Sequence, residues 1–338
     1  MRANACRPEV CSGSGKTTCI KQRATGPLMQ PHQLSSGDVI ADRRADYARM
    51  LEEGGEPEAA AELMEQALEL VPAWAAGWYR LATYLEKAGR GEAAIEAYRR
   101  TLTLDPDDIF GAALKLALLG DAATPDLPPS RYVERLFDDY ADRFESALVE
   151  KLDYSVPQKL AALIASTGRR YELAVDLGCG TGLLGPEIRA NVGRLEGFDL
   201  SQNMLAKAAE KHVYDGLAQA DLSLAPDLSG VFADAGRHRA DLVTAADVLM
   251  YLGNLESVFA IVGELAASGA DIAFSVEDAG EGDGFHLAPS LRYAHSESYV
   301  RMLLARHGLE ILKTVKSVIR KDGGKPVSGI LFLTRKPA

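Results

Sequence analysis

The chain has 338 residues, a length typical of about two domains, and a formal net charge of −11 from 37 basic and 48 acidic residues. This acidic charge is spread along the chain, which excludes a nucleic-acid backbone or an anionic membrane as the main partner. No apolar run approaches the ~18 residues of a membrane span, and the first residues lack the apolar core of a signal peptide. These observations predict a cytoplasmic protein.

Residues 1–36 are predicted to be a disordered N-terminal segment. Residues 1–28 carry five basic side chains against one acid and show no apolar period. The composition fits either an organelle-targeting peptide or a true start at Met29, and on both interpretations the segment is dispensable. Three of the four cysteines lie here without C-x-x-C spacing, so neither a disulfide framework nor a metal site is predicted.

Residues 37–120 are Ala-rich, follow helical spacing and repeat with a period of 34. The same step relates Pro72 to Pro106 and Gly55 to Gly89. This period resembles tetratricopeptide repeats (TPR), which implies an all-α module of paired helices. The second copy matches best, through Trp78, Leu81, Ala82, Ala94, Tyr98 and Pro106. The first copy is weaker, with Arg44 where tryptophan would stand.

The repeat array is short, with two copies and one further helix over residues 109–119. Such an array is near or below the length that is stable alone, so we expect it to lean on the next domain or on a partner. A groove that docks a protein partner and a purely structural prop or dimer surface both fit this sequence. Residues 121–130 contain three prolines and are predicted to be a linker.

The domain at 131–338 begins with a predicted amphipathic helix, and its first strand follows at Leu173–Leu177. The glycines at 178, 180 and 182 then form a turn before a helix. Such a turn accepts positive φ and lets a polar ligand reach backbone N–H groups at a helix N-terminus. The pattern Gly180-x-Gly182-x-x-Gly185 also matches the dinucleotide fingerprint, so context must choose the cofactor.

Asp176 stands two residues before Gly178, which directly follows the strand, and this register resembles motif I of the class I S-adenosylmethionine methyltransferases. The resemblance runs from about residue 132 to the C-terminus. It implies S-adenosylmethionine as cofactor and a small-molecule methyl acceptor. The stretch from Phe137 to Glu145 looks like the helix that lids the cofactor in ubiquinone-biosynthesis-type methyltransferases, although phenylalanine replaces the usual tyrosine at 137 and 144.

Acidic residues follow successive predicted strands. Asp199 ends the strand at 195–200, where a carboxylate can accept hydrogen bonds from both ribose hydroxyls of a bound nucleoside. Asp221 follows the next strand, and its methyltransferase counterpart contacts the adenine amino group. Asp247 follows the strand at 240–245. Predicted cofactor-binding residues are Phe137, Tyr140, Asp176, Gly178, Cys179, Gly180, Asp199, Leu200, Met204, Asp221, Leu222 and Asp247.

The C-terminal strands, at 309–319 and 327–334, are predicted to form an antiparallel hairpin. This completes a seven-stranded Rossmann-like sheet, whereas dehydrogenase domains continue with another crossover helix. The loop at 278–295 is long for a compact domain, so we expect it to bind the methyl acceptor. Its Tyr293 and His295 are the candidate general bases.

These features predict a methyltransferase with an N-terminal TPR module. Two alternatives stay open, a nicotinamide-dependent oxidoreductase and a non-enzymatic TPR scaffold.

Overall fold

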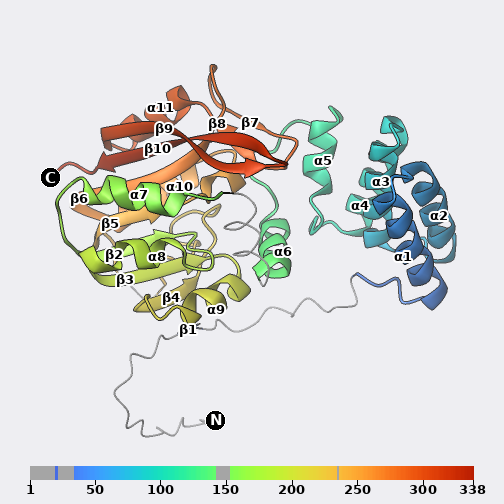
Figure 1. The fold of residues 1–338 in the computed structure, drawn as a ribbon, viewed down its shortest axis with the longest axis horizontal. Coiled ribbons are helices and arrows are strands. Elements are labelled where there is room, and N and C mark those ends of the chain that lie inside the picture. Colours follow the sequence, from blue (N-terminus) through green and yellow to red (C-terminus); the bar gives the residue numbers. More distant parts are fainter. Residues whose placement is uncertain (1–19, 22–33, 142–152, 234–235) are drawn as a thin grey trace, which may run out of the picture.

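The computed structural model describes residues 20–21, 34–141, 153–233 and 236–338. A helical module contains α1 to α5, and an α/β domain with one mixed sheet follows it (Figure 1). The predicted lid residue Phe144 lies outside the described residues, as does most of the N-terminal segment.

The helical module has the repeat geometry that the sequence period predicts. Its helices are α1 (Val39–Glu53), α2 (Pro57–Leu70), α3 (Ala75–Lys87) and α4 (Gly91–Leu104). Gly55 and Gly89 close the first helix of each repeat with φ of 85° and 76°, values that favour glycine. The small residues Ala60 and Ala94 are both fully buried, which lets the paired helices approach closely.

A fifth helix, α5 (Ala112–Leu118), joins the module to the sheet domain. Its Leu114 is fully buried and packs in one cluster with Leu287 and Tyr293, from the short strands β7 (Phe285–Leu287) and β8 (Tyr293–His295). The Tyr293 hydroxyl donates to the Pro125 carbonyl over 2.8 Å. The repeats therefore lean on the next domain, as expected for so short an array.

The sheet domain has a parallel core and an antiparallel end. The strand order is β1-β4-β3-β2-β5-β6-β10-β9, with β8 beside β6 and β7 beside β8. The long strands are β2 (Tyr171–Leu177), β3 (Val192–Asp199), β4 (Gly216–Gln219), β5 (Ala240–Ala245), β6 (Ala266–Asp278), β9 (Glu310–Asp322) and β10 (Lys325–Arg335). From β2 the next strands are added toward β4, and from β5 they are added on the other side of β2. The order of the strands therefore reverses between β2 and β5, and open α/β sheets bind ligands at such a position.

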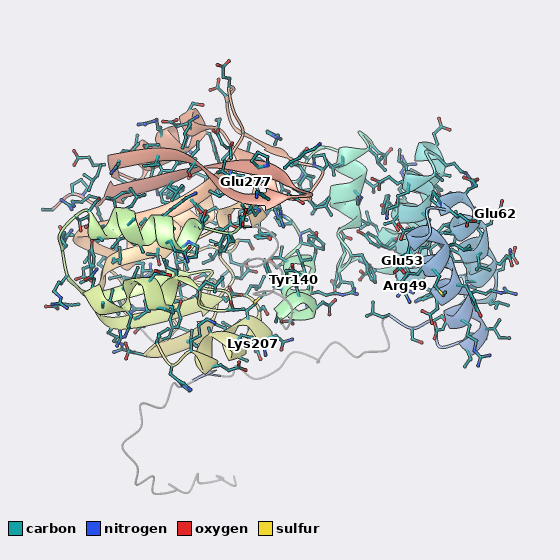
Figure 2. The ribbon with its side chains drawn as sticks, in the orientation of Figure 1. Arg49, Glu53, Glu62, Tyr140, Lys207 and Glu277 are labelled. Atoms are coloured by element: carbon teal, nitrogen blue, oxygen red, sulfur yellow. The ribbon has the colours of Figure 1, made fainter. Side chains whose placement is uncertain are left out.

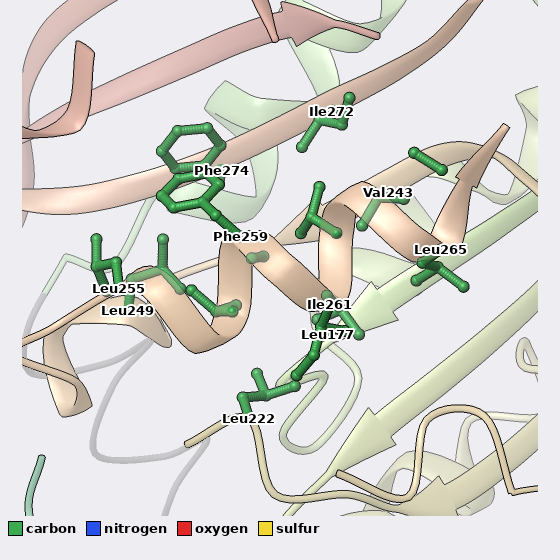
Figure 3. Packing of buried hydrophobic residues seen from close by; sticks show 14 of the residues in the cluster. Leu177, Leu222, Val243, Leu249, Leu255, Phe259, Ile261, Leu265, Ile272 and Phe274 are labelled. Carbon is green, nitrogen blue, oxygen red and sulfur yellow. The ribbon is translucent and has the colours of Figure 1, made fainter. Parts of the chain in front are cut away.

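Helices cover both faces of this sheet. They are α7 (Val156–Ala165), α8 (Leu184–Ile188), α9 (Gln202–Glu210), α10 (Glu256–Leu265) and α11 (Glu297–Arg306), while α6 (Ser130–Tyr140) lies at the carboxyl ends of the strands. Successive strand residues point to opposite faces, so Val243 packs against α10 while Leu242 packs in the cluster that contains α7. Figure 3 shows the α10 side, where Phe259 meets Phe274 with ring centroids 5.4 Å apart.

The fold class is confirmed, with corrections in detail. Seven strands form a Rossmann-like sheet with the predicted antiparallel hairpin at its end, and β1 (Ile20–Lys21), β7 and β8 add to them. The N-terminal segment was predicted to be disordered throughout, but Ile20 and Lys21 pair in parallel with β4. Without β1, β4 would be the edge strand of the sheet and would present unpaired backbone N–H and C=O groups. A short segment without an apolar period can therefore pair with β4.

Residues 278–295, expected to be a loop, instead contain the β7–β8 hairpin. Within the described ranges, no helix is long and apolar enough to cross a membrane.

The α5 contact makes a prediction about stability. Leu114→Ala should lower the free energy of unfolding by about 2–5 kcal/mol, because it leaves a cavity between the two domains. Leu70→Ala is the control, since Leu70 is 46% exposed on α2 and should cost no more than about 0.5 kcal/mol. Chemical denaturation of both variants measures the difference, and equal losses would contradict the proposed packing role of α5.

Candidate active site

The glycine turn after β2 forms the base of the site. Gly178, Gly180 and Gly182 have φ of 67°, 54° and 82°, so all three occupy the left-handed region. A Cβ at Gly178 would come within 2.3 Å of Val248 Cγ2, which leaves no space for a side chain there. The turn therefore has a backbone conformation in which residues other than glycine would be strained.

Asp199, at the end of β3, ties this turn to the neighbouring strand. Its Oδ2 accepts a hydrogen bond from Gly180 N over 2.8 Å, and its Oδ1 accepts from Ser201 N over 2.9 Å. Burial raises the pKa of the Asp199 carboxyl to about 6, and the backbone N–H donors act in the opposite direction. A carboxylate has about four acceptor positions, so Asp199 can still accept from a ligand.

The methyltransferase resemblance implies that Asp176 binds the cofactor, as it does for Asp199. The environment of Asp176 differs from that of Asp199. It is buried, and its two oxygens accept from the hydroxyls of Tyr214 and Thr244 over 2.8 and 2.7 Å. Burial raises its pKa to about 6. These bonds fix the end of β2 under the turn.

Helix α6 covers the turn and is held there by polar contacts. The Ser201 hydroxyl donates to Asp138 Oδ1 over 2.5 Å, and Gln219 Nε2 donates to Glu134 over 3.1 Å. The Phe137 ring lies edge-on against Tyr251, with centroids 4.8 Å apart. Figure 2 shows Tyr140 near the end of this helix, on the side of the sheet domain that faces the repeats.

A cavity of about 270 Å³ lies between α6, the glycine turn and the carboxyl ends of the strands. The predicted residues that line it are Phe137, Tyr140, Asp176, Gly178, Cys179, Gly180, Asp199, Leu200, Asp221, Leu222 and Asp247. Thr181 also lines it, and its buried hydroxyl has no hydrogen-bond partner in the described part of the chain. An unsatisfied buried hydroxyl facing a cavity fits a polar ligand.

Cys179 lines the cavity as a buried thiol. Burial raises its pKa well above the usual value, so it stays protonated and is not a nucleophile. Across the described ranges, no cluster of acidic, histidine or cysteine side chains is suited to a metal ion.

Three predicted residues lie outside the cavity lining. Met204 is fully buried, and its backbone N–H donates to the Ser201 hydroxyl at the start of α9. Tyr293 and His295 are buried in β8. The His295 Nε2 atom lies 2.9 Å from the Leu252 carbonyl, and burial lowers the His295 pKa to about 4. The ring is therefore neutral at pH 7 and donates from Nε2 to backbone, away from the expected role as a base.

Two arginines, Arg292 and Arg320, also line the cavity, and the sequence did not predict either of them as a site residue. Arg320 is only 1% exposed and donates from one terminal nitrogen to both oxygens of Asp247 over 2.9 Å. Its other terminal nitrogen contacts Glu277, which Figure 2 labels on β6. Asp247 itself has a φ of 55°, uncommon for a residue other than glycine. No local pattern marks an arginine in an edge hairpin as a partner of acids far away in the sequence.

Comparisons with known proteins agree with this geometry. Residues 175–272 match the family model described as a methyltransferase domain, and residues 75–119 match the one described as a tetratricopeptide repeat. The two resemblances predicted from the sequence are therefore confirmed, and the chain contains a methyltransferase domain and a tetratricopeptide repeat.

Two curated relatives share part of the chain. The ubiquinone biosynthesis O-methyltransferase of Azoarcus sp. (strain BH72) is 30% identical over 121 residues, which is 35% of this chain and 50% of that protein. The protein of the same name from Methylococcus capsulatus is 29% identical over 119 residues, 35% of this chain and 49% of that protein. The chain thus spans about half the length of the curated relatives it matches.

Solved structures of similar fold include the magnesium protoporphyrin IX methyltransferase of Synechocystis PCC 6803 with bound S-adenosylhomocysteine. It is 20% identical with a TM-score of 0.45, and the match covers 61% of this chain and 99% of that one. An S-adenosylmethionine-dependent methyltransferase from Clostridium acetobutylicum is 17% identical with a TM-score of 0.44, covering 60% and 100%. Likeness at this level carries no argument about activity.

The Arg320 pairs give a second testable prediction. Arg320→Met should cost about 3–5 kcal/mol of unfolding free energy, because Asp247 and Glu277 would be left as buried carboxylates without a cation. The matched control is Lys321→Met, since Lys321 is 47% exposed and pairs with Asp153 at the surface, where such pairs contribute about 0–1 kcal/mol. Denaturant titration compares the two, and similar losses would show that Arg320 is not paired as described.

Proposed function

We propose that this chain transfers a methyl group from S-adenosylmethionine to a small-molecule acceptor. The observation that carries the proposal is the Asp199 carboxylate, which is bound to the glycine turn and also lines the cavity under α6. A nucleoside placed on such a turn directs its ribose hydroxyls at the carboxylate on the neighbouring strand end.

The other cavity residues fit the same ligand. Asp221 lies past the end of β4, and its Oδ1 accepts from the Ser223 N–H over 2.9 Å, which leaves Oδ2 as an acceptor for the adenine amino group. Leu200 and Leu222 provide apolar surface on either side, suited to a purine ring. The Thr181 hydroxyl, which has no partner among the described residues, suits the carboxylate end of the cofactor.

Bound S-adenosylmethionine would supply an electrophilic methyl group on its sulfonium. The protein's contribution is to align the acceptor with that methyl and to exclude water from the cavity. Phe137 and Tyr140 of α6 close the cavity on one side, which serves the second role. Among the described residues that line the cavity there is no histidine or lysine, so a base from these residues would be a carboxylate or a tyrosine.

The acceptor class follows in part from the relatives. Both curated relatives are named for O-methylation in ubiquinone biosynthesis, so an oxygen nucleophile is the first class to test. A protein partner for the TPR helices and a cytoplasmic location stay predictions. The oxidoreductase alternative is not favoured, because the sheet ends in the antiparallel β9–β10 pair and because the matching family model describes a methyltransferase domain.

The proposal predicts how cofactor affinity depends on pH. The ribose hydroxyls would bind the ionised Asp199, whose pKa in the free protein is about 6. The affinity for S-adenosylhomocysteine should therefore be constant from pH 7 to 8 and fall below pH 6 as the carboxyl takes up a proton. Asp199→Asn should bind about 10-fold or more weakly at pH 7.5, the loss expected for removing a charge-assisted hydrogen bond, and should lose the pH dependence.

Isothermal titration calorimetry at several pH values measures both effects. Asp176→Asn is the matched control, because the Asp176 pKa is also about 6 but its oxygens are bound by Tyr214 and Thr244. This control should keep the wild-type pH profile of binding. A pH-dependent affinity that survives in Asp199→Asn would remove Asp199 from the ribose site.

A further inference from the structure

Arg292 reaches the cavity from the β7–β8 hairpin. It stands directly before β8, and its carbonyl accepts from Ala288 N over 2.8 Å, which closes the hairpin. The side chain is 24% exposed and lines the cavity. The predicted acceptor loop therefore does contribute to the site, through Arg292 rather than through its neighbours Tyr293 and His295.

The charge of Arg292 is less fully paired than that of Arg320. Arg320 is held between Asp247 and Glu277 by close ion pairs. Arg292 forms an ion pair with Asp322, in which the Arg292 Nη1 atom lies 3.5 Å from Asp322 Oδ2, and the Asp322 side chain is 54% exposed. Tyr251 also forms a hydrogen bond with Arg292. Burial acts to lower the pKa of Arg292, but Tyr251, Glu277 and Asp247 raise it, and the net effect is a pKa above the usual value. The guanidinium therefore keeps its positive charge.

Arg320 adds a second donor on the same side of the site. Its Nε–H is buried and has no partner in the described part of the chain, although both terminal nitrogens are engaged. Asp247 and Glu277 are already bound by Arg320, so they offer little to a cationic ligand. This end of the cavity therefore presents N–H donors from two arginines.

Apolar side chains line other parts of the same cavity. Leu136 and Phe137 of α6, Pro157 of α7, and Met250 and Leu252 after β5 line the cavity. A ligand that fits this surface carries an apolar body and one anionic end. A planar carboxylate matches the fixed fork of an arginine with two parallel hydrogen bonds.

We propose that Arg292 is a specificity-determining residue that binds a carboxylate on the methyl acceptor. The proposal rests on the proposed methyl transfer and narrows its acceptor to apolar carboxylic acids. Arg292 acts here in recognition, and the carboxylate it holds need not be the atom that is methylated.

The test compares carboxylates with their uncharged amides. Benzoate, cinnamate, naphthoate and decanoate, each beside its primary amide, are titrated by calorimetry into the full chain saturated with S-adenosylhomocysteine. At least one carboxylate should bind about 10-fold or more tightly than its amide. Arg292→Gln should abolish that preference, and Arg292→Lys should restore only part of it, because the ammonium lacks the planar fork.

Asp322→Asn is the matched control. It removes the surface partner of Arg292 and should leave the carboxylate preference unchanged or larger. Melting temperature and S-adenosylhomocysteine affinity confirm that each variant is folded. Absence of any carboxylate preference in the wild type, or its survival in Arg292→Gln, overturns the proposal. Failure of the wild type to bind S-adenosylhomocysteine would instead overturn the proposed function, so the two failures are distinguishable.

Discussion

The hydrogen bonds of Asp199 are the constraint on which the site depends. They join the end of β3 to the turn after β2, so the glycine backbone and the carboxylate are fixed relative to each other before any ligand arrives. A hydrogen-bond acceptor that is already fixed in position loses less conformational entropy when a ligand binds than a mobile one does. This arrangement buries the Asp199 carboxylate, which raises its pKa to about 6. A ligand that donates hydroxyl hydrogen bonds to the carboxylate would stabilise its charged form.

The surrounding elements hold this arrangement from two sides. Ser201 begins α9 and also bonds to Asp138 on α6, so the helix that covers the cavity is attached to the same strand end as Asp199. On the opposite side, α5 of the repeats packs against the hairpin that carries Arg292. The helical module therefore contacts the hairpin that lines one end of the cavity.

Local patterns predicted most of the fold and the glycine turn at the base of the cavity. The 34-residue period placed the paired helices, and Asp176 with the alternating glycines placed the turn, because each signal lies within a short stretch of chain. The position of the two arginines that line the cavity depends on pairing between distant segments. The parallel pairing of β8 with β6 buries His295 and leaves Arg292 at the cavity, and nothing in residues 278–295 indicates which of them would be turned inward. Arg320 was missed for the same reason, since its partners lie 73 and 43 residues away in the sequence.

The most direct test of the account is a crystal structure of the full chain with S-adenosylhomocysteine. The account predicts both ribose hydroxyls within hydrogen-bond distance of Asp199, the adenine beside Asp221, and α6 over the ligand. A ligand bound outside the cavity, or a ribose directed away from Asp199, would contradict it.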